Sequence, residues 1–209
     1  MVAAVLDHIV YAVPDLAAGV EEFTELTGVV PAKGGQHVGI GTANYLVGLG
    51  ADAFLEIIGP DPAQETPTRP RPFGIDGLGE PCVMAWAVRT NDLDAAVDAA
   101  KERGYDPGEI APMSRATPSG ETLNWRLTWA DVRDGPALVP FLIDWGATPT
   151  PPSRGLPEIG LEAFEATHPI PDGVRGALRA LDADLPVDAG NRAALVVTLA
   201  GPNGRVVLT

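Results

Sequence analysis

VLDHIVYAVPDLAAGVEEFTELTG, residues 5–28, decides the fold, because it reads as a strand that runs directly into a helix. Its first half is rich in β-branched residues and fits a half-buried strand. In its second half, apolar residues recur at the spacing of one helical face. Asp15 can cap the start of this helix and Gly28 can close its end. The apolar face of the predicted helix consists of Leu16, Val20, Phe23 and Leu26.

The same order returns in VMAWAVRTNDLDAAVDAAKERG, residues 83–104, with Asn91 or Asp92 as the polar cap. Three strand-like stretches follow each of the two helices, separated by glycine clusters and turns. The repeated order of strand, helix and three strands predicts an α+β fold of two tandem βαβββ modules. Three apolar positions of the second helix stand 77 residues after their counterparts in the first: Leu93, Val97 and Ala100 match Leu16, Val20 and Phe23.

Two proline-rich stretches divide the chain into candidate units. The tail after the second stretch starts again as a strand, Pro-Asp and a helix, and then gives two strands joined by the turn at 201–204. This tail predicts a partial third βαββ unit, one strand short, that docks as an edge or cap. The expected division is a first module at 1–60, a linker at 61–80, a second module at 81–146, a linker at 147–157 and the partial unit at 158–209.

The chain is strongly acidic, with 28 Asp and Glu against 14 Lys and Arg in 209 residues and a formal net charge of -14. Nucleic acids and anionic membranes require a basic surface, so neither is an expected partner. No window approaches 18 uncharged apolar residues, which argues against a membrane span. Cys82 is the single cysteine and the N-terminal stretch lacks the basic start of a signal peptide, so a cytoplasmic protein is expected.

An acid–histidine pair, Asp7–His8, interrupts the first apolar strand. Histidine on a strand can be a core residue satisfied by one hydrogen bond, or a metal ligand or acid–base group on a rigid element. Because neighbouring side chains on a strand alternate, we expect Asp7 to face the opposite side from His8, either as a surface residue or as an acid that supports a site residue.

A glutamate, Glu56, interrupts a second apolar strand, AFLEIIG, in the same module. A lone buried carboxylate is costly unless a cation, a donor or a proton compensates it. A divalent ion would explain both His8 and Glu56, whereas a direct His8–Glu56 hydrogen bond is the alternative. His37 could complete a ligand set, because the glycines beside it allow close approach of the backbone, or it could be an exposed loop residue.

Three further residues are candidates for substrate binding. In ETLNWRLTW, Trp125 belongs to a large apolar face and Arg126 to the opposite polar face. Arg126 could hold a substrate carboxylate if that face lines a cavity, or it could be a solvated surface residue. Asn44 could form a hydrogen bond to a substrate oxygen or to an adjacent turn.

His168 precedes the third predicted helix and is interpreted as structural.

The segments LDHIVYAVPDL, GGQHVGIGTANYLVGLG, FLEIIGPD and PFLIDWG together resemble the glyoxalase-like subgroup of the vicinal oxygen chelate superfamily. That resemblance implies that the two modules pair their sheets into a cup-shaped half-barrel. It also implies a divalent metal on the floor of the cup, chelated by two oxygens of the substrate.

The resemblance places the first-strand histidine of the superfamily on His8 and the fourth-strand carboxylate on Glu56. In the second module, the position that matches His8 is Ala85, which cannot bind a metal. The aspartate of LIDW resembles the glutamate of LEII, so Asp144 is a further candidate ligand. The implied metal site is therefore His8, Glu56, His37 and Asp144, holding iron, manganese, zinc or nickel.

The leading hypothesis is a metal-dependent enzyme of the lyase/isomerase or dioxygenase type, in which Glu56 could also shuttle a proton. A non-catalytic protein that sequesters a small molecule in the same cup is the alternative. A third option is an interaction module, with the extra unit forming an oligomer edge, for example in a homodimer.

Overall fold

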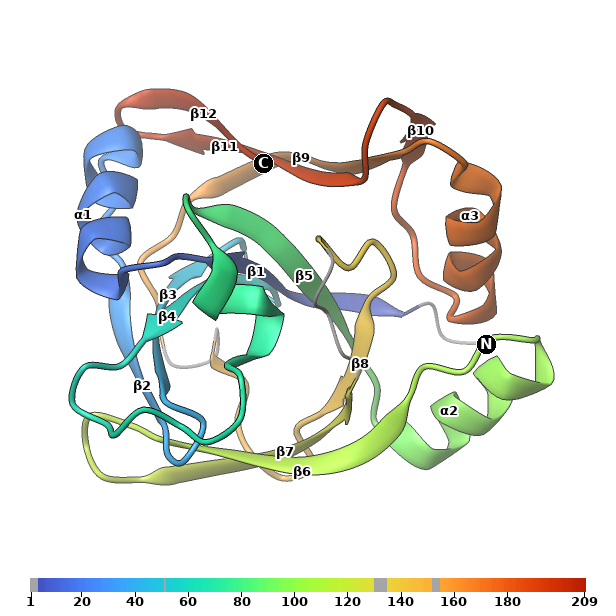
Figure 1. The fold of residues 1–209 in the computed structure, drawn as a ribbon, viewed down its shortest axis with the longest axis horizontal. Coiled ribbons are helices and arrows are strands. Elements are labelled where there is room, and N and C mark those ends of the chain that lie inside the picture. The colour runs from blue at the N-terminus through green and yellow to red at the C-terminus, as the bar shows by residue number, and fades with distance from the viewer. Residues whose placement is uncertain (1–3, 51, 130–134, 152–154) are drawn as a thin grey trace.

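The computed structural model describes residues 4–50, 52–129, 135–151 and 155–209. In the first module, one strand and one helix are followed by three strands, as the sequence predicts (Figure 1). The bounds are β1 Val5–Ala12, α1 Leu16–Thr27, β2 Ala32–His37, β3 Thr42–Gly48 and β4 Phe54–Pro60.

The second module repeats this order after a short 3-10 helix, η1, at Pro72–Gly77. Its cap is Asp92, whose side chain accepts a hydrogen bond from the backbone N–H of Ala95. The bounds are β5 Cys82–Arg89, α2 Leu93–Glu102, β6 Glu109–Ala116, β7 Thr122–Trp129 and β8 Phe141–Asp144.

The eight strands of the two modules form one closed barrel in the order β1-β4-β3-β2-β6-β7-β8-β5. Each module pairs its first strand with its last in parallel, and β1 joins β5 antiparallel between the modules. The second junction is short, since Gln36 of β2 pairs with Ala116 of β6. The predicted α+β fold of paired βαβββ modules is confirmed, and the expected open cup closes at this junction.

The first helix packs as its sequence pattern predicts, with one exception. Asp15 caps its start by accepting from Ala18 N–H, and Gly28 ends it at φ 75°. Leu16 and Phe23 are buried against the sheet, whereas Leu26 is 45% exposed. The predicted apolar face is therefore wrong at Leu26, which lies in the last turn of α1 on the solvent side.

The C-terminal unit forms a separate sheet in the order β10-β9-β11-β12. It contains an additional three-residue strand, β10, so its order is strand, helix and three strands, and the expectation of a βαββ unit one strand short is wrong. Its pairing also differs from that of a module, because its first strand β9 lies between β10 and β11 instead of beside its last strand. The bounds are β9 Gly160–His168, α3 Pro171–Ala180, β10 Val187–Ala189, β11 Ala194–Gly201 and β12 Gly204–Leu208.

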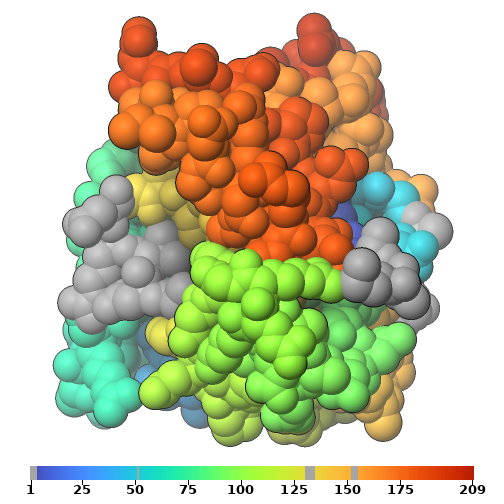
Figure 2. Space-filling model, turned by 90° about the vertical axis from the view of Figure 1, so that its right-hand side faces the viewer, coloured from blue at the N-terminus to red at the C-terminus, as the bar shows by residue number. Residues whose placement is uncertain are grey.

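This sheet covers one side of the barrel (Figures 1 and 2). The ring of Phe164 on β9 meets Trp86 of β5 edge-on, with ring centroids 5.3 Å apart. Near α2 and α3, Arg103 donates to the Ala180 carbonyl at 3.1 Å and to Asp182 at 2.7 Å. No helix within the described ranges is long and apolar enough to cross a membrane.

Candidate functional site

A cavity lies inside the barrel, and both modules contribute to its wall. Polar side chains from β1, β2, β3, β4 and β6 gather in it, and aromatic rings form much of the remaining surface. Segment 72–73, at the start of η1, lies along its edge. The polar residues that line it are His8, His37, Thr42, Asn44, Glu56 and Arg115.

His8 enters the cavity from β1 with Asp7 in contact with it. The His8 Nδ1 and Asp7 Oδ1 atoms are 2.6 Å apart. The second Asp7 oxygen accepts a hydrogen bond from Trp145 Nε1 at 3.0 Å and lies 3.6 Å from Arg89 Nη1. When His8 Nδ1 carries the proton donated to Asp7, its Nε2 lone pair is available on the cavity side.

The predicted separation of Asp7 from His8 is wrong. Asp7 is fully buried, and its carboxylate bonds the neighbouring imidazole. The pairing of β1 with β5 shifts register between Leu6 and His8, so strict alternation does not hold at Asp7. Sequence pattern alone does not reveal such an irregularity.

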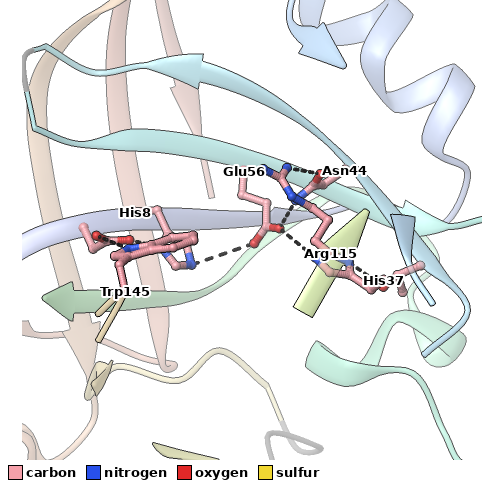
Figure 3. Close-up of polar contacts among 8 residues, drawn as sticks. His8, His37, Asn44, Glu56, Arg115 and Trp145 are labelled. Atoms are coloured by element: carbon pink, nitrogen blue, oxygen red, sulfur yellow. Dashed lines mark hydrogen bonds and ion pairs between the residues drawn. The ribbon is translucent and has the colours of Figure 1, made fainter. Parts of the chain in front are cut away.

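Glu56 lies between the two cavity histidines (Figure 3). Its Oε2 is 3.8 Å from His8 Nε2, and its Oε1 is 3.9 Å from His37 Nε2. Asn44 Nδ2 donates to Oε1 at 2.5 Å. The buried carboxylate thus has an amide donor, which its place in an apolar strand requires, and it lies between two imidazole rings.

His37 stands at the end of β2 and is 6% exposed, so the interpretation as an exposed loop residue is wrong. Its Nδ1 is 3.0 Å from Thr42 Oγ1. Burial lowers the pKa of His37 below its ordinary value, although the negative charge of Glu56 acts to raise it. His37 is therefore neutral at neutral pH, and one ring nitrogen can donate while the other accepts.

Arg115 on β6 is a cavity residue that the sequence analysis misses. Its Nη1 donates to Asn44 Oδ1 at 2.8 Å, so the chain Arg115–Asn44–Glu56 fixes which end of the amide faces the carboxylate. A Cβ at Gly34 would overlap Asn44 Oδ1 and Arg115 Nη1, and one at Gly35 would overlap the Ala116 carbonyl. The double glycine before His37 is the sequence signal for this close approach.

Two predicted site residues lie outside the cavity. Trp125 and Leu127 line it, so strand alternation turns Arg126 outward, where its guanidinium pairs with Asp94 at 2.9 and 3.0 Å. Ile143 also lines it, and the Asp144 carboxylate instead accepts from Gly146 N–H at 2.8 Å. His168 bonds the Ile170 backbone, consistent with a structural role.

A family model described as a glyoxalase-like domain matches residues 6–181. The chain belongs to the glyoxalase-like domain family. This family assignment, together with the paired modules, places the protein in the vicinal oxygen chelate superfamily, as its sequence segments predict. A comparison with curated proteins finds no match.

Among solved structures, the glyoxalase-like protein is similar to a hypothetical protein from Staphylococcus aureus, with a TM-score of 0.63 and 17% identity over 99% of this chain and 84% of that one. Methylmalonyl-CoA epimerase from Mycobacterium tuberculosis aligns with a TM-score of 0.43 and 19% identity over 69% and 92% of the two chains. Methylmalonyl-CoA epimerase from Streptomyces coelicolor aligns with a TM-score of 0.44 and 18% identity, over 70% of this chain and 100% of that one. The similarity to the Staphylococcus aureus protein, at 17% identity, shows a shared fold and nothing finer.

The superfamily implies a divalent metal, and the donors here have the right chemistry but not the right arrangement. Ligands bound at 2.0–2.2 Å to one tetrahedral ion lie about 3.3–3.6 Å apart. His8 and His37 instead approach different oxygens of Glu56, at 3.8 and 3.9 Å, with the carboxylate between them. Within the described part of the chain, no group of three or more His, Cys, Asp or Glu residues is placed to hold a metal ion. Of the predicted set, His8, Glu56 and His37 meet in the cavity, whereas Asp144 lies outside it.

Proposed function

We propose that the protein is a small-molecule enzyme of the lyase or isomerase class that moves a proton at a carbon next to a carbonyl group. One observation carries this proposal: the Asp7-oriented His8 and the Glu56 carboxylate face each other in a largely apolar cavity. Two positioned proton acceptors of this kind can take a proton from a carbon atom and pass it on.

Glu56 is the group proposed to remove the proton. Asn44 holds its Oε1 by a hydrogen bond, which leaves Oε2 directed toward His8. The proton passes from the substrate carbon to the carboxylate, and the electron pair of the broken C–H bond moves onto the carbonyl oxygen. His8 Nε2 lies 3.8 Å from Oε2, so it can exchange that proton through one water molecule and return it at another face or carbon, and the step needs no oxidant.

The negative charge that develops on the substrate oxygen requires donors, and two cavity residues can supply them. Arg115 lines the cavity and brings a permanently charged guanidinium group, an N–H donor, to its wall. His37 can donate from Nε2 when the Thr42 hydroxyl donates to its Nδ1. Preorganised donors in a site screened from water stabilise such an oxyanion strongly.

Proton exchange tests the proposal without knowledge of the natural substrate. The protein is incubated in D₂O with a panel of small ketones, aldehydes and thioesters, and loss of the α-proton signals is followed by ¹H NMR. We expect exchange with the wild type, at least about 100-fold slower exchange with Glu56→Gln, and an unchanged rate with Arg126→Gln. Arg126→Gln is a suitable control because Arg126 faces outward on the strand that carries Trp125.

Two outcomes would replace the proposal. Binding of the panel without exchange would support the alternative of a non-catalytic small-molecule binder. Exchange that is lost after EDTA treatment and restored by Fe²⁺, Mn²⁺, Zn²⁺ or Ni²⁺ would support the metal-dependent hypothesis, and would require the donors around Glu56 to rearrange.

A further inference from the structure

We infer that the cavity takes a neutral, flat aromatic or conjugated molecule that carries a carbonyl or hydroxyl oxygen. The inference rests on the proposed function only for the choice of cavity. Two independent features support it: the concentration of aromatic rings around the cavity, and the cancellation of charge within it.

The aromatic residues of this chain are gathered at the cavity. Of four tryptophans and five phenylalanines in the sequence, three of each line it. The main core cluster, by contrast, is mostly aliphatic, with Tyr11, Phe23 and Trp86 as its buried aromatic residues. The six residues are Phe54, Phe73, Trp125, Trp129, Phe141 and Trp145.

The rings present flat faces next to the acid–base residues. The His8 ring stacks on Phe54 with centroids 4.8 Å apart and planes 20° from parallel, and Phe141 meets it edge-on at 5.4 Å. The ring centroids of Trp125 and Trp145 lie 5.1 Å apart on the cavity wall. Offset stacked and edge-to-face contacts favour an aromatic guest over a saturated ring of the same size.

The mouth of the cavity is aromatic as well. Phe73, Trp129 and Phe141 line both the inner cavity and a larger outer groove that adjoins it. Trp129 is 40% exposed, so part of its ring faces solvent. A flat molecule entering from the groove therefore meets these three rings on its way to the inner cavity.

The formal charges at the cavity cancel in pairs. Glu56 is linked to Arg115 through Asn44, and Asp7 behind His8 lies 3.6 Å from Arg89. His37 is neutral because its environment is buried. An anion attracted to Arg115 is also repelled by Glu56, and a cation attracted to Glu56 is also repelled by Arg115, so either ion loses its hydration for little net attraction. A neutral ligand avoids both costs.

Isothermal titration calorimetry with four matched compounds tests the inference. Acetophenone is the neutral aromatic probe, cyclohexyl methyl ketone its saturated counterpart, and benzoate and benzylammonium its charged counterparts. We expect acetophenone to bind at least tenfold more tightly than each of the other three. Equal or tighter binding of the saturated ketone, or tighter binding of either ion, would overturn the inference.

Variants separate a specific site from general hydrophobic binding. Trp125→Leu and, independently, Phe141→Leu should each weaken acetophenone binding at least tenfold, whereas Arg126→Gln should bind as the wild type does. If both leucine variants remain folded by circular dichroism and bind normally, the aromatic wall is not the binding surface and the inference is wrong.

A further variant distinguishes this inference from the proposed function. Glu56→Gln should retain acetophenone binding while it loses proton exchange. If the wild type binds acetophenone selectively but exchanges no proton of any panel compound, the proposed function fails and the ligand class stands. If exchange occurs only with charged or saturated compounds, the ligand class fails and the proposed function stands.

Discussion

Asp7 and His8 show how one irregular residue pair builds the site. Both lie on β1, yet Asp7 bonds the neighbouring imidazole, Trp145 and, at longer range, Arg89. A buried carboxylate with three partners is costly to remove, because each partner then loses its hydrogen bond or its counter-charge. Asp7 therefore contributes both to the stability of the barrel and to the orientation of His8.

Asp7→Ala should lower the free energy of unfolding by about 2–3 kcal/mol, because Trp145 and Arg89 lose a buried acceptor. Urea denaturation of the two proteins measures the difference. Asp52→Ala is the matched control. The Asp52 Oδ1 atom also lies near Arg89, 3.8 Å from its Nη2 atom, but the Asp52 side chain is 75% exposed. The control should differ from wild type by less than about 0.5 kcal/mol. Equal effects of the two substitutions would contradict the account of Asp7.

Burial of His37 makes stability depend on pH. Its pKa in the folded protein is lowered by burial, so between its ordinary pKa of about 6.5 and that lower value the unfolded state binds a proton that the folded state does not. Stability should therefore fall as the pH falls below about 6.5. His37→Gln should reduce this slope, measured by urea denaturation between pH 7.5 and 5, while His168→Gln should keep it. A slope unchanged in His37→Gln would show that another group is responsible.

At the scale of elements, the double glycine of β2 allows the amide of Asn44 and the guanidinium of Arg115 to lie against the backbone. The strand pairing supports this arrangement, because β2 lies between β3, which carries Asn44, and β6, which carries Arg115. The two side chains then meet beside Gly34 and direct the Asn44 amide toward Glu56.

Gly34→Ala should displace this pair, because its Cβ would overlap both Asn44 Oδ1 and Arg115 Nη1. We expect acetophenone binding and proton exchange each to weaken at least about tenfold, with a loss of stability of about 1–3 kcal/mol from overpacking. Gly79→Ala is the control, because a Cβ there meets no described atom within 4 Å. If Gly34→Ala retains full exchange and binding, the Arg115–Asn44 contact does not position Glu56.

Sequence pattern predicts the elements well and the site in part. The repeated period of apolar residues identifies both modules, because secondary structure in each follows local spacing. His8, His37, Asn44, Glu56 and Trp125 do gather at one cavity. Arg115 is missed because its strand has a weak apolar pattern, and the interpretation of Arg126 depends on which strand face turns inward. Pairing between strands that are distant in the sequence determines which face of this strand turns inward. The same kind of pairing determines barrel closure and the strand order of the C-terminal sheet.

At the scale of the whole molecule, the C-terminal sheet completes the packing of the barrel's outer surface. Trp86 is buried beneath Phe164, and the Val83 N–H donates to the terminal Thr209 carbonyl at 3.0 Å. At the far end, the Asn203 N–H donates to the Thr27 carbonyl at the end of α1. The sheet therefore contacts both modules.

Gly201→Ala should disrupt this docking, since its Cβ would overlap the Thr27 carbonyl, a backbone atom that cannot rotate away. A loss of about 1–3 kcal/mol is expected from overpacking, measured by thermal or urea unfolding. Gly160→Ala, in the neighbouring strand of the same sheet, is the control, because its nearest contacts are at an ordinary 3.4 Å. Equal stability of the two variants would show that the sheet is not seated on α1 in this way.

The proposed site requires that Asp7 hold the Nδ1 proton of His8 and leave Nε2 as the basic atom facing Glu56. Long-range ¹H–¹⁵N NMR of the histidine rings, recorded at a pH where imidazole is neutral, measures this directly. We expect His8 Nδ1 to give the shift of a protonated nitrogen and Nε2 that of an unprotonated one, and we expect Asp7→Ala to remove the preference. A wild-type spectrum in which Nε2 carries the proton would show that Asp7 does not set the tautomer of His8.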